Sequence, residues 1–186
     1  MEIVEGIATV EDVEAFVARL GEIGATHDVA VQAFDARAVV DRTHLERAVT
    51  FANRAFERGE TIANDRAVEI LCYAAGRRQI DRAMAMGVTV GELPVAVVVD
   101  GGPEPATDQE PATDREAAAD REAAADREAA AAAAVRDLLE PGSTLDGFDE
   151  ARVRDYFDVS DAELAAAGGD LAGVVHERVA LLVVNR

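Results

Sequence analysis

The chain has 186 residues, the size of one ordinary domain with one hydrophobic core. Its 37 acidic residues outnumber 18 basic ones, all of them arginine, and the net charge is −19. The lack of lysine argues against a Walker phosphate loop or a kinase-type ATP site, and a single cysteine, Cys72, excludes a disulfide within the chain and a thiolate zinc cluster.

The acid excess is typical of a protein adapted to concentrated salt, as in halophiles, because counterions screen the self-repulsion. The first residues form neither a basic leader nor a long apolar run, and no later stretch approaches the roughly 20 apolar residues that span a bilayer. The three histidines and two serines are scattered, with no nucleophile beside a base. We therefore expect a cytoplasmic protein of a halophile that is not an enzyme and holds no metal or other cofactor.

The first part of the chain predicts two strands around a helix. Residues 2–8 alternate in polarity as a strand does, and residues 29–34 form a second run of strand length. Between them, apolar residues recur at helical spacing from an N-cap at Thr9, with Asp12 in the first turn, until two glycines, the second of them Gly24.

Two longer helices follow. Thr43 with Glu46 forms a capping-box signature for a helix that ends at Gly59. The Asn-Asp pair at 64–65 can cap the next helix, which ends at Gly76.

A short helix after Gly76 carries Arg78 and Arg82, whose four-residue spacing places both on a common helix face. Residues 93–99 are continuously apolar, which predicts a buried strand.

The composition then changes to a repeated six-residue unit over residues 104–134, rich in alanine and in alternating acid and arginine. In a helix, a step of six residues rotates equivalent positions by about 240°, so no apolar stripe accumulates beyond alanine itself. We treat residues 103–134 as an alanine-rich helical or disordered insertion that stays solvated and interrupts a single domain over residues 1–186. We expect the fold to survive removal of residues 104–134; a helix that binds a partner is the alternative.

The last part of the chain predicts helices. Residues 148–157 form one, Ser160 with Glu163 makes another capping box, and residues 171–184 have apolar positions at three- and four-residue spacing. The order of elements predicts an α+β (mixed α/β) fold with a small mixed sheet covered by several helices. The last helix is more apolar than a peripheral helix requires, and the candidates on it for a partner contact are Val174, Leu181 and Val184.

The arginines are concentrated: nine of the 18 lie in residues 37–82, where there are seven acidic residues. A locally basic segment on an acidic protein is a candidate phosphate or nucleic-acid site. Spacing alone favours the alternative that these arginines pair with acids of the same segment on helix faces.

A resemblance changes this balance. Residues 32–88, above all EILCYAAGRRQIDRAMAMGV at 69–88, resemble the small kinase-binding subunit (PRPK-binding protein, Cgi-type) of the KEOPS tRNA-modification complex, and HERVALL at 176–182 resembles the last helix of that family. The likeness covers about residues 1–100 and 137–184. It implies a non-catalytic subunit that binds the complex's atypical kinase/ATPase and helps recruit tRNA by its 3′ CCA end for threonylcarbamoyladenosine modification.

Single-stranded RNA ends are bound by cations that pair with phosphates and by surfaces that stack on bases. Residues 66–88 offer both kinds of group, with Arg78 and Arg82 as the predicted centre; the full set is Arg66, Tyr73, Arg77, Arg78, Gln79 and Arg82. Two alternatives stay open: a structural kinase-binding adaptor that does not contact RNA, and a small carboxylate-based enzyme.

Overall fold

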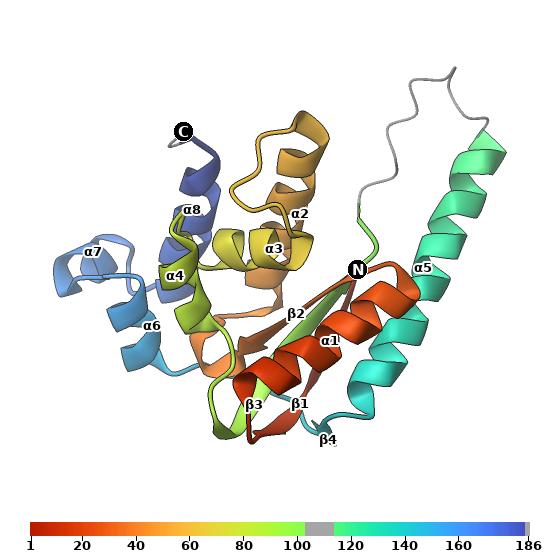
Figure 1. Ribbon diagram of the computed structural model, residues 1–186. Helices are drawn as coiled ribbons and strands as arrows, with labels where there is room; N and C mark the ends of the chain where they lie inside the picture. The colour runs from red at the N-terminus through yellow and green to blue at the C-terminus, as the bar shows by residue number, and fades with distance from the viewer. Residues whose placement is uncertain (103–113, 185–186) are drawn as a thin grey trace.

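The computed structural model describes residues 1–102 and 114–184, with the backbone alone for residues 114–120 and 184 (Figure 1). Its centre is a sheet of strands β1 (Glu2–Val10), β2 (Ala30–Asp35), β3 (Gly91–Asp100) and β4 (Glu140–Pro141), in the order β2-β3-β1-β4. The predicted α+β class is confirmed, but every pairing in the sheet is antiparallel, so the sheet is not mixed as predicted.

Strand β3 lies between β1 and β2, which explains its sequence. The register sets Glu2 opposite Val99 and Asp35 opposite Val95. Because β3 is covered on both faces, its residues from Val95 to Asp100 are all buried, as the continuous apolar run predicts.

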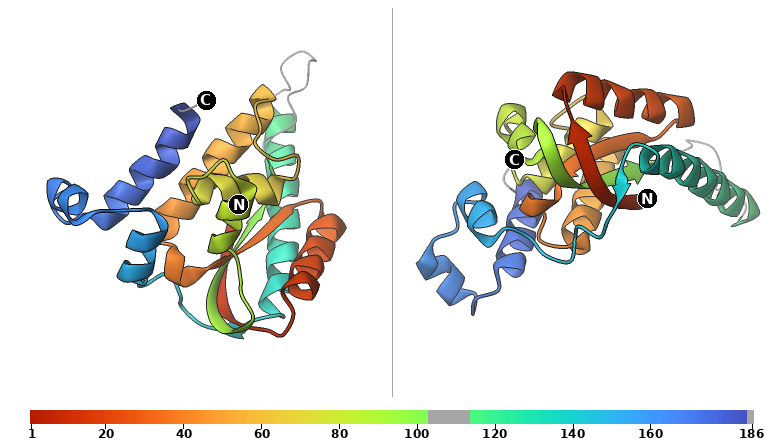
Figure 2. Two further views of the ribbon diagram at one scale, coloured as in Figure 1. Left: turned by 60° about the vertical axis from the view of Figure 1, so that its left-hand side comes forward. Right: turned by 90° about the horizontal axis from the view of Figure 1, so that it is seen from below.

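Helices cover both faces of the sheet (Figure 2). Helices α1 (Val13–His27) and α5 (Asp114–Arg136) pack on one face against a cluster that includes Val97 of β3. Helices α2 (Arg42–Arg58), α3 (Arg66–Ala74) and α8 (Leu171–Val184) pack on the other face around Phe34 and Val98. The shorter helices are η1 (Ala36–Ala38), α4 (Ile80–Ala83), η2 (Met84–Met86), α6 (Glu150–Tyr156) and α7 (Asp161–Ala166).

Two of the predicted helix starts are wrong. Helix α1 is capped by Asp12, because Thr9 still belongs to the ladder of β1 and lies opposite Glu92. Helix α2 is capped by Asp41, whose carboxylate accepts the amide of His44, so the Thr43–Glu46 signature lies inside the first turn.

The other predicted caps are confirmed. The carboxylate of Asp65 accepts the amide of Val68 at the start of α3, and the hydroxyl of Ser160 accepts the amide of Glu163 in α7. Helix α1 also runs through Gly24 to His27; a Cβ at Gly24 would lie 2.7 Å from the carbonyl oxygen of Val29, so glycine is needed where the chain turns into β2.

The alanine-rich segment is helical from residue 114 onward, while residues 103–113 lie outside the described part of the chain. The expectation that it has nothing to bury is wrong for its last turns. Ala131, Ala132 and Val135 are completely buried against α1 and the sheet, and Glu128 is 9% exposed. Alanine is small enough for the helix backbone to approach the sheet closely, so removal of residues 104–134 would uncover the core at this point.

Across residues 1–102 and 114–184, no helix is both long enough and apolar enough to cross a membrane.

Candidate RNA and partner interface

Four of the nine arginines in residues 37–82 form ion pairs, and all four reach outside that segment. The pairs are Arg37–Asp35, Arg42–Glu5, Arg66–Asp100 and Arg77–Asp158. All of residues 37–82 are described, and no ion pair joins two of them. The alternative that the segment neutralises itself on its helix faces is therefore wrong.

Three of the seven acids in the segment hold backbone groups instead. Asp41 and Asp65 cap α2 and α3. Glu69 is completely buried, and its carboxylate accepts the amides of Ile62 and Ala63, which fixes the loop before α3. Carboxylates that hold helix ends and loops are not available to neutralise arginines on the surface.

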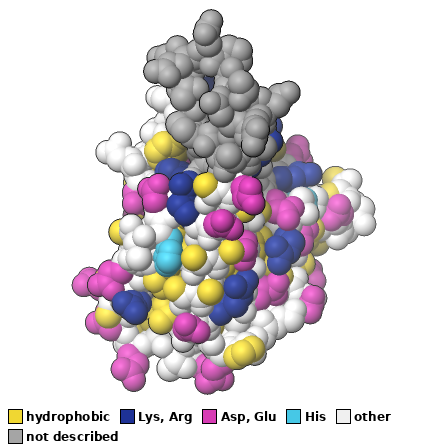
Figure 3. All heavy atoms as spheres, turned by 90° about the vertical axis from the view of Figure 1, so that its right-hand side faces the viewer, with side chains coloured by type: hydrophobic (Ala, Val, Ile, Leu, Met, Phe, Trp, Pro, Cys, Tyr) yellow, Lys and Arg dark blue, Asp and Glu magenta, His cyan; other side chains and the backbone are white. Residues whose placement is uncertain are grey.

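Five arginines consequently stay exposed, without a carboxylate partner in the described part of the chain: Arg47, Arg54, Arg58, Arg78 and Arg82. On the side of the molecule that carries α1 and α5, by contrast, acidic and basic side chains are interspersed (Figure 3). Unpaired guanidinium groups on a chain with a net charge of −19 are candidates for binding an anion.

The predicted centre, Arg78 and Arg82, is exposed, but its geometry differs from the prediction. Arg78 precedes Gln79, the N-cap of the four-residue helix α4, so the two arginines do not share a helix face by the four-residue rule. The carbonyl of Arg82 accepts the hydroxyl of Tyr156 at 3.1 Å, which ties α4 to α6. Arg78, Gln79 and Arg82 thus lie together at one exposed, anchored turn.

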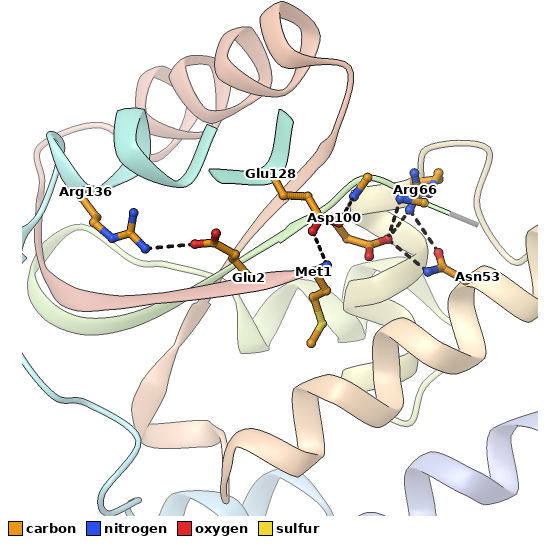
Figure 4. Close-up of polar contacts among 9 residues, drawn as sticks. Met1, Glu2, Asn53, Arg66, Asp100, Glu128 and Arg136 are labelled. Carbon is orange, nitrogen blue, oxygen red and sulfur yellow. Dashed lines mark hydrogen bonds and ion pairs between the residues drawn. The ribbon is translucent and has the colours of Figure 1, made fainter. Parts of the chain in front are cut away.

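Arg77 and Arg66 are occupied inside the protein. Arg77 donates to the carbonyl of Tyr156 at 2.7 Å and to Asp158 at 3.0 Å, with its guanidinium 5.8 Å from the centre of the Tyr156 ring. Arg66 donates to Asn53 and pairs with Asp100 at the end of β3 (Figure 4). Both side chains hold segments of this chain together.

Tyr73 is 2% exposed and lies against Phe51, with ring centres 6.1 Å apart. In this conformation it offers no surface on which a base can stack. Tyr156 of α6 is half-buried beside the Arg78–Arg82 turn, and no sequence pattern selects it, because it joins that turn only through the fold.

Burial shifts the pKa of three titratable groups near these residues. Burial raises the pKa of Cys72 to about 11 and that of Tyr156 to about 12, so both are protonated at neutral pH. Burial lowers the pKa of His44 to about 4. Among the side chains that the structure describes, no three of His, Cys, Asp or Glu gather as metal ligands do. The exposed guanidinium groups of this arrangement can bind anions.

The residues of α8 predicted to contact a partner differ in how exposed they are in the structure. Leu181 is 42% exposed, whereas Val174 is 6% exposed and packs in the core, so its selection as a contact residue is not supported. The side chain of Val184 lies outside the described residues. Beside this face, Arg178 of α8 donates two hydrogen bonds to Glu163 of α7, at 2.8 and 3.0 Å, a contact that no sequence spacing predicts.

Apart from the exposed face of α8, an apolar cavity lies between α1, α3 and η2. It is a cavity of about 110 Å³ with Val17, 49% exposed, and Met84, 52% exposed, among its lining residues. Exposed Met and Val at the lining of an apolar cavity are typical of a contact with a partner side chain.

Comparison with known proteins decides the family. The sequence model of the family described as Kinase binding protein CGI-121 matches residues 8–182, from β1 into α8. This chain belongs to the CGI-121 family. No curated protein matches the chain. Membership of the CGI-121 family gives the partner class, a kinase, and agrees with the resemblance seen at residues 69–88 and 176–182.

Proposed function

We propose that this CGI-121 family member is the non-catalytic small subunit of the KEOPS complex, which binds the complex's atypical kinase/ATPase and helps recruit tRNA by its 3′ CCA end. The kinase part is supported by the family. The RNA part is supported by one observation above all: the Arg78–Gln79–Arg82 turn is exposed and its arginines lack a carboxylate partner in the described residues, although the chain has two acids for each arginine.

Recognition of the 3′ end rests on guanidinium forks rather than on stacking. A guanidinium can donate two parallel hydrogen bonds to one phosphate, which keeps its value when salt screens simple charge attraction. Since Tyr73 is buried, base stacking at this site is limited to the partly exposed ring of Tyr156.

The test is tRNA binding by the unmodified protein, Arg82→Lys and Arg82→Glu, each with intact and CCA-trimmed tRNA at fixed salt. We expect trimming to weaken binding by the unmodified protein, and both variants to bind intact tRNA less well, because lysine keeps the charge and loses the fork. Equal affinity in all six combinations contradicts the proposed RNA site.

A second candidate is a structural kinase-binding adaptor that does not contact RNA. It is favoured by the internal use of Arg66, Arg77 and Tyr73, half of the residues selected from the sequence. Kinase binding without any measurable tRNA binding by the isolated protein or by its kinase complex supports the adaptor.

The kinase surface is tested by Leu181→Asp on α8 and Val17→Asp at the cavity, each of which adds one charge at an exposed apolar position. We place the kinase on α8 and expect only Leu181→Asp to weaken its binding. Loss in Val17→Asp alone assigns the kinase to the cavity and contradicts the α8 site.

A further inference from the structure

Helix α2 exposes one polar stripe that the proposed 3′-end site does not use. Its solvent-facing positions recur at three- and four-residue spacing, which keeps them on one face. Apart from Arg42, which is exposed at the start of α2 and pairs with Glu5, these residues are Thr43, Arg47, Thr50, Arg54, Glu57 and Arg58. We call Arg47, Arg54 and Arg58 the α2 arginine row.

The charge of this stripe is opposite to that of the whole chain. Three arginines stand beside one acid, in a protein with 37 acids and 18 arginines. None of the three has a carboxylate partner in the described part of the chain, whereas the exposed Arg19 of α1 is paired with Glu22 at 2.9 Å. A face adapted only to concentrated salt would carry acids, so solvent adaptation does not explain the row.

Local contacts account for part of the row. Arg58 lies in the last turn of α2, where a cation is favoured by the helix dipole, and the guanidinium of Arg54 lies 6.0 Å from the centre of the Phe51 ring. Arg47 has neither explanation. Both contacts leave the guanidinium groups exposed, with their N–H donors turned to no acceptor of the described chain.

We infer that the α2 arginine row binds the phosphate backbone of tRNA outside the 3′ CCA end. That the ligand is tRNA rests on the proposed function. That it binds at the α2 arginine row is argued from the charge of the row, which is complementary to that of phosphates. From Arg47 to Arg58 the row is about 16 Å long at 1.5 Å of rise per residue, a length over which a nucleic-acid strand presents several phosphates.

The same features favour RNA over a protein partner. The exposed stripe has no apolar side chain at its centre, while protein interfaces are built around desolvated aromatic and aliphatic groups. Helix α3 contacts both α2 and α4 and separates the row from Arg82 in the fold (Figures 1 and 2). The row therefore contributes affinity without reading sequence, and the Arg78–Arg82 turn contributes the preference for the 3′ end.

The test compares two double variants with the same change of charge. Arg47→Gln/Arg54→Gln removes two members of the row, and Arg19→Gln/Arg127→Gln removes two exposed arginines from α1 and α5. Binding of intact and CCA-trimmed tRNA is measured from low to molar salt. For the row variant we expect the slope of log affinity against log salt to fall by about two units with both RNAs, because two phosphate contacts are lost. The control variant keeps the slope of the unmodified protein.

Three results overturn the inference. If the row variant keeps its slope and affinity while Arg82→Glu loses binding to intact tRNA, the proposed RNA function stands and the row has no part in it. If the row variant loses kinase binding and keeps RNA binding, the row belongs to a protein contact. Absence of tRNA binding by the unmodified protein removes the proposed RNA function and this inference with it.

Discussion

The alanine repeat and the arginine segment are both rich in charge, and the fold uses them in opposite ways. The last turns of the repeat close the core: Ala131 and Ala132 are buried although the repeat has no apolar stripe. The arginine segment does the reverse: three of its seven acids hold backbone groups, and its arginines pair with carboxylates outside the segment or stay exposed. Whether an alanine is buried depends on how closely its helix can approach the sheet. Whether an arginine is paired depends on which helices and strands the fold brings next to it.

The largest effect is expected where the repeat meets the sheet. Ala132→Asp places a charge in a completely buried position of α5, while Ala133→Asp adds the same charge one residue later, at an exposed position. We expect Ala132→Asp to lower the free energy of unfolding by about 3 kcal/mol or more, and Ala133→Asp by less than about 0.5 kcal/mol. Chemical denaturation at fixed molar salt measures both, and equal stability of the two variants contradicts the docking of α5.

Acidification should weaken the other region through His44. Its Nε2–H donates to the carbonyl of Ala74 at 2.8 Å, and burial lowers its pKa to about 4 from an ordinary 6.5. Because the folded state holds the proton less well than the unfolded state, stability is kept above pH 6.5 and is lost as the pH falls toward 4, by up to about 3 kcal/mol.

The measurement is the difference in unfolding free energy between the unmodified protein and His44→Gln at pH 7 and at pH 4.5. The glutamine has no ionisable group, so the two proteins should approach each other in stability at the lower pH. A difference that does not change with pH contradicts this account of His44.

Glu69→Gln tests the use of the segment's acids by the backbone. The amide side chain keeps one acceptor for Ile62 and Ala63 and loses the charge, so we expect a loss of about 1 to 3 kcal/mol. As a matched control, Glu57→Gln changes an exposed acid of α2 and should leave stability within about 0.5 kcal/mol.

Local patterns in the sequence predicted the parts of the fold that local physics determines. The apolar run at 93–99 and the short run at 29–34 are strands because they are buried, and Asp65 and Ser160 cap helices because each has a free amide three residues later. At the starts of α1 and α2, two residues could each cap the helix. At α1, Thr9 is held in strand β1, so Asp12 caps the helix; at α2, Asp41 caps the helix in place of Thr43.

The exposure of the candidate residues was predicted in part, for a physical reason. Exposure of Arg78, Gln79 and Arg82 agrees with a polar turn after a glycine, and the choice of Leu181 agrees with its place off the apolar stripe. The use of Arg77 could not be foreseen, because its partner Asp158 is 81 residues away and meets it only when α6 packs beside α3 and α4. Ion pairs that join distant elements leave no spacing in the sequence.

The most direct test of the account is one comparison, Arg37→Gln against Arg82→Gln, and Arg82→Gln is expected to have almost no effect on stability. Arg37 donates to both oxygens of the buried Asp35, at 2.9 and 2.7 Å, whereas Arg82 has no carboxylate partner in the described chain. With unfolding free energy and tRNA affinity measured on the same preparations, Arg37→Gln should lose about 1 to 3 kcal/mol of stability and bind tRNA normally when folded. Arg82→Gln should keep its stability within about 0.5 kcal/mol and bind intact tRNA more weakly. Normal tRNA binding by Arg82→Gln, or weakened binding by a folded Arg37→Gln, would contradict the claim that the unpaired arginines of residues 37–82 are the ones that bind RNA.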